Sequence, residues 1–255
     1  MLTPYDFQEN LQQRAQYIRN RLQSGSPVIG LSYDNGVMLL SVRRQTRKVY
    51  EIYDRLMLSA IGNQSDVETV RLAAIDFAHQ EGFVRSPDDV TVQRVVGFAL
   101  SPALKKAFGD PLTAPFVFRG LFAELHDRPE DDLFYILNYD GDFLPMNRMA
   151  VIAGTTYAEE QALQYLKEQI QSVPALEEAI RRALTAWGIA RRLATQEERE
   201  HVSEREAHET LREILDSETH VEAGVLERQT LRENRFRLLR PEEIAAAMPL
   251  PPSSP

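Results

Sequence analysis

The chain has 255 residues, a net charge of −9 and no cysteine. This length allows one large domain or two small ones, and an apolar content of 43% supports a sizeable core. Without cysteine there are no disulfides or thiolate sites, so we expect a cytoplasmic protein. The acidic balance argues against general nucleic-acid binding, which needs a basic face. The chain has no run of about 18 apolar residues and no secretory signal at its start, so no membrane association is expected.

The N-terminal part predicts a helix over residues 8–23, which Ser24-Gly25 then ends. Its apolar stripe consists of Leu11, Ala15, Ile18 and Leu22. We expect this stripe to pack either on its own domain or on a neighbouring subunit. Before the helix, residues 1–7 form a short segment in which Pro4 opposes a continuous helix, and such termini are most often frayed.

Strands and helices then follow in blocks. A β-hairpin is predicted from residues 28–31 and 37–42, because Asp34-Asn35-Gly36 between them tolerates positive φ. Two more strands are predicted at 48–54 and 56–61. A helix is expected to begin at Ser65 or Asp66 and to end at Gly82. A second helix begins at Ser86-Pro87 and is kinked at Pro102.

The second half repeats this order of blocks. Strands are predicted at 116–125, 132–139, 142–146 and 148–153, helices at 157–172 and 174–190, a hairpin at 221–228 and 235–239, and a last helix from Pro241. Strand blocks separated by helix pairs favour two stacked antiparallel sheets with helices outside, an α+β four-layer αββα sandwich.

The domain is predicted to span residues 8–248. Within it, residues 191–218 are highly charged and carry only a thin apolar stripe, which predicts an exposed helical extension. The tail, residues 249–255, is rich in proline and is predicted to be disordered.

No metal or cofactor site is predicted. The five histidines do not fall at metal-ligand spacing, and the GxSxG, P-loop and GxGxxG motifs are absent. His201 and His208 are seven residues apart on the charged segment, and we interpret them as surface residues.

Several short motifs, taken together in their order and spacing, resemble the α-type subunit of the proteasome core particle, in its actinobacterial version. These motifs are Gly25-Ser26-Pro-Val-Ile-Gly30, Asn35-Gly36-Val37, Lys48-Val-Tyr-Glu-Ile-Tyr-Asp54, Ala60-Ile-Gly62 and Gly154-Thr155-Thr156. The similarity runs from about residue 5 to 189 and resumes near 221–248. Residues 191–218 depart from the family, whose bacterial members carry a flexible loop there.

The resemblance implies the fold of the N-terminal nucleophile hydrolases. In catalytic β-type relatives a threonine begins the first strand, and its free amine serves as the base. An acidic residue on the second strand and a lysine on the next support it. Here Ser26, Val42 and Lys48 stand at these positions, so the resemblance implies a subunit without catalytic residues. Two alternatives stay open: a hydrolase that uses Ser26 after self-processing, and an inactive assembly protein of the same fold.

The resemblance also implies partners. It implies a homo-oligomeric, seven-membered ring that caps a catalytic β-type subunit and docks a ring-shaped ATPase activator. For Lys48 the plain interpretation is a surface or ion-paired lysine. The family instead uses this lysine, with positions matching Gly25, Gly62 and Asn63, to receive the activator's C-terminal carboxylate; an apolar residue is common where Asn63 stands. The implied gate residues are Met1, Leu2, Thr3, Pro4, Tyr5, Asp6 and Phe7.

Overall fold

The computed structural model of the chain describes residues 4–196, 201–215 and 218–248. The predicted gate residues Met1, Leu2 and Thr3 lie outside the described residues, as do parts of the predicted extension (197–200 and 216–217) and the whole predicted tail, 249–255.

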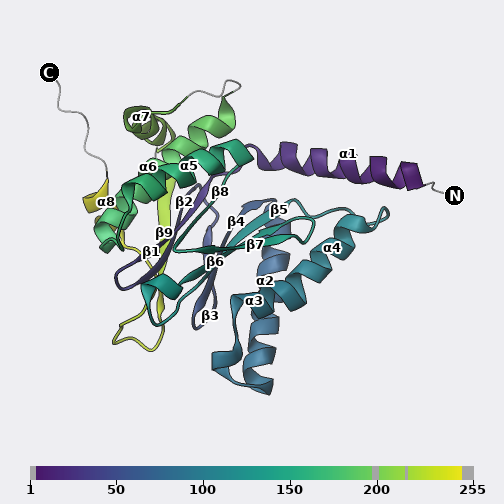
Figure 1. The fold of residues 1–255 in the computed structure, drawn as a ribbon, viewed down its shortest axis with the longest axis horizontal. Helices are drawn as coiled ribbons and strands as arrows, with labels where there is room; N and C mark the ends of the chain where they lie inside the picture. The colour runs from purple at the N-terminus through teal and green to yellow at the C-terminus, as the bar shows by residue number, and fades with distance from the viewer. Residues whose placement is uncertain (1–3, 197–200, 216–217, 249–255) are drawn as a thin grey trace.

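Two five-stranded antiparallel sheets are stacked face to face, as predicted (Figure 1). The first sheet has the strand order β10-β9-β2-β1-β8 and the second the order β3-β4-β5-β6-β7. The strands of the first sheet are β1 (Val28–Tyr33), β2 (Gly36–Arg43), β8 (Met149–Ile152), β9 (His220–Glu227) and β10 (Phe236–Leu238). The strands of the second sheet are β3 (Val49–Tyr53), β4 (Leu56–Gly62), β5 (Phe118–Glu124), β6 (Leu133–Asn138) and β7 (Phe143–Asn147).

Helices cover both outer faces, so the four-layer sandwich is confirmed (Figure 1). The first sheet carries α5 (Thr156–Gln169), α6 (Leu176–Thr195) and α8 (Pro241–Ala247), with α7 (Glu204–Ile214) packed on α6. The second sheet carries α2 (Gln64–Val84), α3 (Val92–Arg94), a π-helical segment η2 (Val95–Leu100) and α4 (Ser101–Gly109). Short 3₁₀ turns lie at η1 (Pro87–Asp89) and η3 (Pro129–Asp131).

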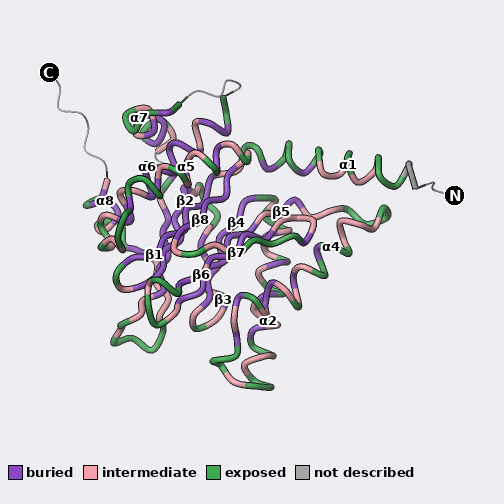
Figure 2. Tube along the Cα trace, in the orientation of Figure 1, coloured by how far each residue is buried: buried purple, intermediate pink, exposed green. Residues whose placement is uncertain are grey.

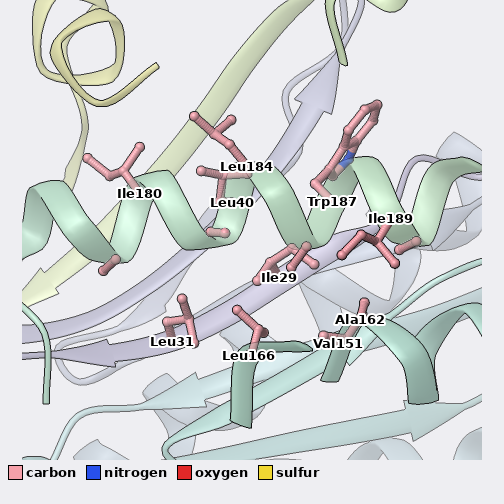
Figure 3. Close-up of a cluster of buried hydrophobic side chains, with 14 of the residues drawn as sticks. Ile29, Leu31, Leu40, Val151, Ala162, Leu166, Ile180, Leu184, Trp187 and Ile189 are labelled. Carbon is pink, nitrogen blue, oxygen red and sulfur yellow. The ribbon is translucent and has the colours of Figure 1, made fainter. Parts of the chain in front are cut away.

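The core has three layers of apolar side chains because each sheet is covered on both faces. In β1, Ile29 and Leu31 join the cluster under α5 and α6, whereas Val28 joins the cluster between the sheets. Figure 3 shows Ile29 and Leu31 together with Leu184 and Trp187 of α6. Burial on both faces explains why the central strands read as apolar without alternation, and Figure 2 shows them buried along their length.

The first hairpin forms where it was predicted, but for a different reason. Tyr33 pairs with Gly36, and neither Asn35 nor Gly36 has a positive φ. A Cβ at position 36 would lie 2.0 Å from the carbonyl oxygen of Leu226 on β9. Glycine is therefore needed for the close approach of two strands rather than for the turn.

Helix α1 spans Pro4–Leu22 and begins earlier than the predicted residue 8. The prediction was wrong because a proline is tolerated in the first turn, where its missing N–H has no intrahelical partner. The helix reaches away from the body of the domain (Figure 1). Only its C-terminal end is buried, through Ile18 and Leu22, while Phe7 is 41% exposed.

The helices of the second sheet differ from the prediction in their ends. Asn63 is the N-cap residue of α2, whereas the predicted cap Asp66 accepts a hydrogen bond from the Val117 amide at 2.8 Å. The helix continues past Gly82 to Val84. A Cβ at Gly82 would lie 2.2 Å from the Tyr53 hydroxyl, so this glycine makes room for a side chain and does not stop the helix.

The predicted helix from Ser86 is divided. Ser86 caps only the turn η1, and Thr91 then caps a new helix by accepting from the Arg94 amide. The expected distortion at Pro102 takes the form of the π-helical segment η2, in which the Ser101 amide bonds to the Val96 carbonyl five residues earlier. Insertion of one extra residue is a known way to accommodate a break in the helical ladder.

The prediction of an exposed extension at 191–218 was wrong for most of the described part. Residues up to Thr195 continue α6, and α7 buries Ala207, Thr210 and Leu211 against its neighbours. The charged residues concealed this face because only every third or fourth position of α7 is buried. Figure 1 shows α7 lying beside α6.

Candidate functional site: a cation-lined cavity at the start of the first strand

A cavity of about 440 Å³ lies where the α1–β1 junction, the β2–β3 connection, α6 and α7 meet. Its volume falls within the roughly 300–1,000 Å³ of typical ligand sites. The residues that line it are Ser24, Ser26, Val42, Arg43, Arg44, Lys48, Trp187, Arg191, Glu213, Ile214 and Thr219. Three of them, Ser26, Val42 and Lys48, are the positions that the sequence placed together as a nucleophile site, and the structure confirms that they line one cavity.

The hydroxyl of Ser26 makes two hydrogen bonds inside the fold. The indole Nε1 of Trp187 donates to Ser26 Oγ at 3.2 Å. Ser41 Oγ lies 3.2 Å away and donates its own proton to the Pro27 carbonyl at 2.7 Å, so Ser26 is the donor of the pair. Ser26 therefore donates one hydrogen bond and accepts another, and neither partner can act as a base.

The amine that would activate Ser26 is part of the main chain. In an N-terminal nucleophile enzyme the base is the free amine of the nucleophilic residue. Here α1 leads directly into this residue and is fixed there, because Arg191 donates to the Ser24 carbonyl at 2.9 Å. Further back, Arg14 donates to the carbonyls of Ala107 and Thr113 at 2.9 and 2.8 Å. The segment before Ser26 is thus an integrated part of the fold, unlike a disposable propeptide.

Lys48 directly precedes β3, and its ammonium is directed to the neighbouring strand β4. Its Nζ donates to the Ala60 carbonyl of β4 at 3.0 Å. Burial lowers the pKa of Lys48 to about 8, and the nearby Glu222 carboxylate opposes that shift. The Val42 side chain carries no charge. Within the described ranges the Lys48 ammonium makes one hydrogen bond, to Ala60, so two of its three donors remain for an incoming anion.

Glu222 on β9 takes over the holding role that an acidic residue at position 42 would have had. Its Oε1 accepts from the main-chain amides of Lys48 and Val49 at 2.7 and 2.8 Å. Its Oε2 lies 2.5 Å from Nε of Arg43. The carboxylate is only 6% exposed, so it joins the start of β3 to the first sheet and fixes the backbone of Lys48.

Positive charge dominates the cavity. Four of its residues are basic, and Arg43 is the one of them that is already paired with Glu222. Burial, followed by repulsion from Arg44, lowers the pKa of Arg191. Cationic groups gathered in a partly buried cavity, with one carboxylate among the lining residues, favour the binding of an anion such as a carboxylate.

The other predicted tail-binding positions, Gly25, Gly62 and Asn63, are not among the residues that line the cavity. Gly25 packs on Ile61 of β4, where a Cβ would lie 3.0 Å from the Ile61 Cβ. Gly62 has a φ of +143°, which favours glycine, and a Cβ added there would lie 2.0 Å from the Val117 carbonyl oxygen. Asn63 accepts a hydrogen bond from Arg21 of α1 at 3.3 Å. Gly62 and Asn63 therefore form the connection between β4 and α2, and Asn63 also binds α1.

The predicted gate residues are only partly described. The backbone of Pro4, Tyr5 and Asp6 forms the first turn of α1, followed by Phe7. Among the described residues, no group of acidic residues and histidines could hold a metal ion. Of the helices in the described ranges, none is long and apolar enough to cross a membrane.

Sequence reasoning missed four residues of the site. Glu222 and Trp187 come from distant parts of the chain, and no local pattern links them to Ser26 or Lys48. Arg191 and Glu213 lie in the charged segment that the sequence assigned to an exposed extension. A useful signal was present in β9, where Glu222 is an acidic residue directly before the apolar run Ala223–Leu226.

Fold and site together define a class of protein: an N-terminal nucleophile hydrolase sandwich in which the nucleophile position is blocked and its acidic support is missing. The family model described as "Proteasome subunit" matches residues 22–200, and the chain belongs to this family.

Curated relatives indicate which type of proteasome subunit the chain resembles. They include proteasome subunit alpha of Nocardioides sp., which is 29% identical over 180 residues, covering 70% of this chain and 69% of the relative. Proteasome subunit alpha of Streptomyces scabiei is 27% identical over 190 residues, 73% of this chain and 75% of the relative. Proteasome subunit alpha of Actinosynnema mirum is 32% identical over 181 residues, 69% of this chain and 66% of the relative. The resemblance found in the motifs is confirmed: the chain is an α-type, non-catalytic proteasome subunit.

Proposed function

We propose that this chain forms the outer ring of a bacterial 20S-like proteasome, in the cytoplasm, and docks a ring-shaped ATPase through the cavity at Lys48. The observation that carries the proposal is the conversion of a nucleophile site into a cation-lined cavity. Ser26 is hydrogen-bonded to Trp187 and Ser41 within an uninterrupted chain, position 42 is an uncharged valine, and Lys48 lines the cavity. A C-terminal carboxylate is the chemical group that such a cavity fits best.

Ring formation is supported by α1. Its apolar stripe is buried at Ile18 and Leu22 but half-exposed at Leu11 and Ala15, and Tyr17 is 53% exposed. A helix that leaves such a stripe uncovered along its outer half suits a contact with a second copy of the chain. We propose a closed seven-membered ring, to which a ring of catalytic β-type subunits is added.

Docking is tested with Lys48→Ala in rings assembled with the β-type partner. Without the ammonium, a buried carboxylate loses its salt bridge, so stimulation of protein degradation by the host's ATPase ring should fall at least tenfold, about 1.4 kcal/mol. Lys167→Ala is the matched control, because Lys167 is an exposed lysine on α5 away from the cavity. Unchanged stimulation of the Lys48→Ala assembly would refute docking at this site.

Entry control is proposed for Met1 to Phe7. Deleting these residues should raise the turnover of small peptides by the assembled particle without adding an activator, because the segment would no longer restrict the axial opening. The same particle with α1 residues Gln8 and Glu9 exchanged for alanine serves as a control for disturbance of the helix. If turnover does not rise after the deletion, this segment does not form the gate.

The two alternatives predict different particles. A hydrolase using Ser26 requires a mature chain that begins at Ser26, which the intact mass of the purified protein detects. An inactive assembly protein requires that the chain form no particle with a β-type subunit. Native mass spectrometry of the chain, alone and with the β-type subunit of the same host, separates both alternatives from the proposed function.

A further inference from the structure

Two arginines of the cavity, Arg44 and Arg191, have no acidic partner within the described ranges. Arg191 lies on α6, where the next residue, Arg192, pairs with the Glu206 carboxylate at 3.3 Å. The hydrogen bond that the Arg191 guanidinium makes in the described part of the chain goes to a neutral acceptor, the Ser24 carbonyl, at 2.9 Å. Most of its N–H donors therefore remain for a ligand.

The two guanidinium groups lie close enough to repel each other. Burial, followed by repulsion from Arg44, lowers the pKa of Arg191. Arg191 follows Trp187 by one helical turn, so both side chains lie on the face of α6 that lines the cavity, and Arg44 reaches the cavity from the β2–β3 connection. Two like charges held together in a partly buried place raise the free energy of the folded chain, and an anion between them lowers it.

The chemistry of the two groups indicates which anion they suit. A guanidinium presents a planar fork of donors that binds two oxygens of one anion at a time. A carboxylate has two oxygens and one negative charge, which one such fork satisfies. A phosphate group has three or more acceptor oxygens and carries up to two charges, so it can bridge two guanidinium groups. The cavity, of about 440 Å³, has room for such a group.

We propose that Arg44 and Arg191 form a binding site for a dianionic phosphate group, either the free ion or the phosphate of a small monoester such as a nucleotide. This site does not depend on the proposed docking function. It bears on that function, because a bound phosphate neutralises two of the cations that attract a carboxylate to the cavity and should weaken docking at Lys48.

The test is equilibrium dialysis of the full-length chain against radiolabelled inorganic phosphate, at an ionic strength held constant with sodium chloride. The wild type should bind phosphate saturably. Arg191→Gln should weaken binding about tenfold, and Arg44→Gln about threefold, because Arg44 is exposed and its charge is screened. Arg47→Gln is the matched control, since Arg47 is an exposed arginine of the same connection outside the cavity lining.

An unlabelled competitor, adenosine monophosphate, distinguishes the two sources of the phosphate group. Displacement of the labelled ion at a similar concentration assigns the site to monoesters as well, and no displacement assigns it to the free ion. Binding that does not saturate, that is unchanged in Arg44→Gln, or that weakens equally in Arg47→Gln would overturn the inference. Arg44→Gln decides the matter even if Arg191→Gln disturbs the end of α1, because the Arg44 side chain is exposed. Docking is measured separately with Lys48→Ala, so its failure would leave the phosphate site untouched.

Discussion

Glu222 is the residue on which the geometry of the cavity depends, and its replacement gives a quantitative prediction. Glu222→Ala removes the acceptor of two main-chain amides, those of Lys48 and Val49, at 2.7 and 2.8 Å. A buried donor left without a partner costs about 1–3 kcal/mol, so the two amides together should lower the free energy of unfolding by about 4 kcal/mol. Arg43 adds little to this loss because it is 30% exposed and can be hydrated.

Glu222→Gln should cost much less. The amide side chain keeps an acceptor oxygen for the two main-chain donors but loses the charge that strengthens those bonds, so a loss of about 1–2 kcal/mol is expected. Glu233→Ala is the control, since Glu233 is exposed in the β9–β10 connection and its replacement should stay within about 0.5 kcal/mol.

The assay is urea unfolding followed by the fluorescence of Trp187, the one tryptophan of the chain, which hydrogen-bonds to Ser26 beside the cavity. All variants are compared at one protein concentration because subunit association contributes to apparent stability. A loss below about 1 kcal/mol for Glu222→Ala, or equal losses for the alanine and glutamine variants, would refute the reasoning.

Three further predictions concern other parts of the fold. Gly188→Ala should lower stability by about 1–3 kcal/mol in the same unfolding assay, because its Cβ would lie 2.3 Å from the Ala207 carbonyl oxygen; a neutral change would mean that α7 moves away freely. Asp132→Ala should cost about 3–5 kcal/mol, since it leaves the largely buried Arg228, held at 2.8 and 2.7 Å, without its carboxylate; a urea midpoint equal to that of the wild type would contradict this. Binding of a carboxylate peptide should weaken as the pH rises through about 8, because Lys48 then loses its proton; equal binding well above and below that pH would contradict the role of its charge.

The strands and most helices could be predicted from the sequence because their signals are local. Apolar runs bounded by turn residues gave β1 and β2, and apolar residues at helical spacing gave α5. The order of strand blocks and helix pairs was enough to predict the four layers, since few topologies allow it.

The errors arose where a residue serves a distant neighbour. Gly82 stands inside α2 because it makes room for Tyr53, and Asp66 does not cap the helix because it binds the Val117 amide. In the charged segment, the buried face of α7 depends on small residues such as Ala207 fitting against Gly188. Such contacts join positions far apart in the chain and leave no periodic trace in the sequence.

Only part of the candidate site could be predicted. The resemblance to catalytic β-type relatives placed Ser26, Val42 and Lys48 together, so their shared cavity was expected. Glu222 comes to the amide of Lys48 through the pairing of β9 with β2, and Arg191 reaches the cavity through the packing of α6. Both depend on the folded chain and have no local signal in the sequence.

The central claim is that the start of β1 receives a carboxylate and performs no bond chemistry. The most direct measurement is the affinity of one peptide, carrying the C-terminal sequence of the host's ring-shaped ATPase, prepared with a free or an amidated C-terminus. The account predicts that the free acid binds the assembled particle at least tenfold more tightly than the amide, since only the acid can pair with Lys48. Equal affinity of the two peptides, or acylation of Ser26 during the titration, would contradict it.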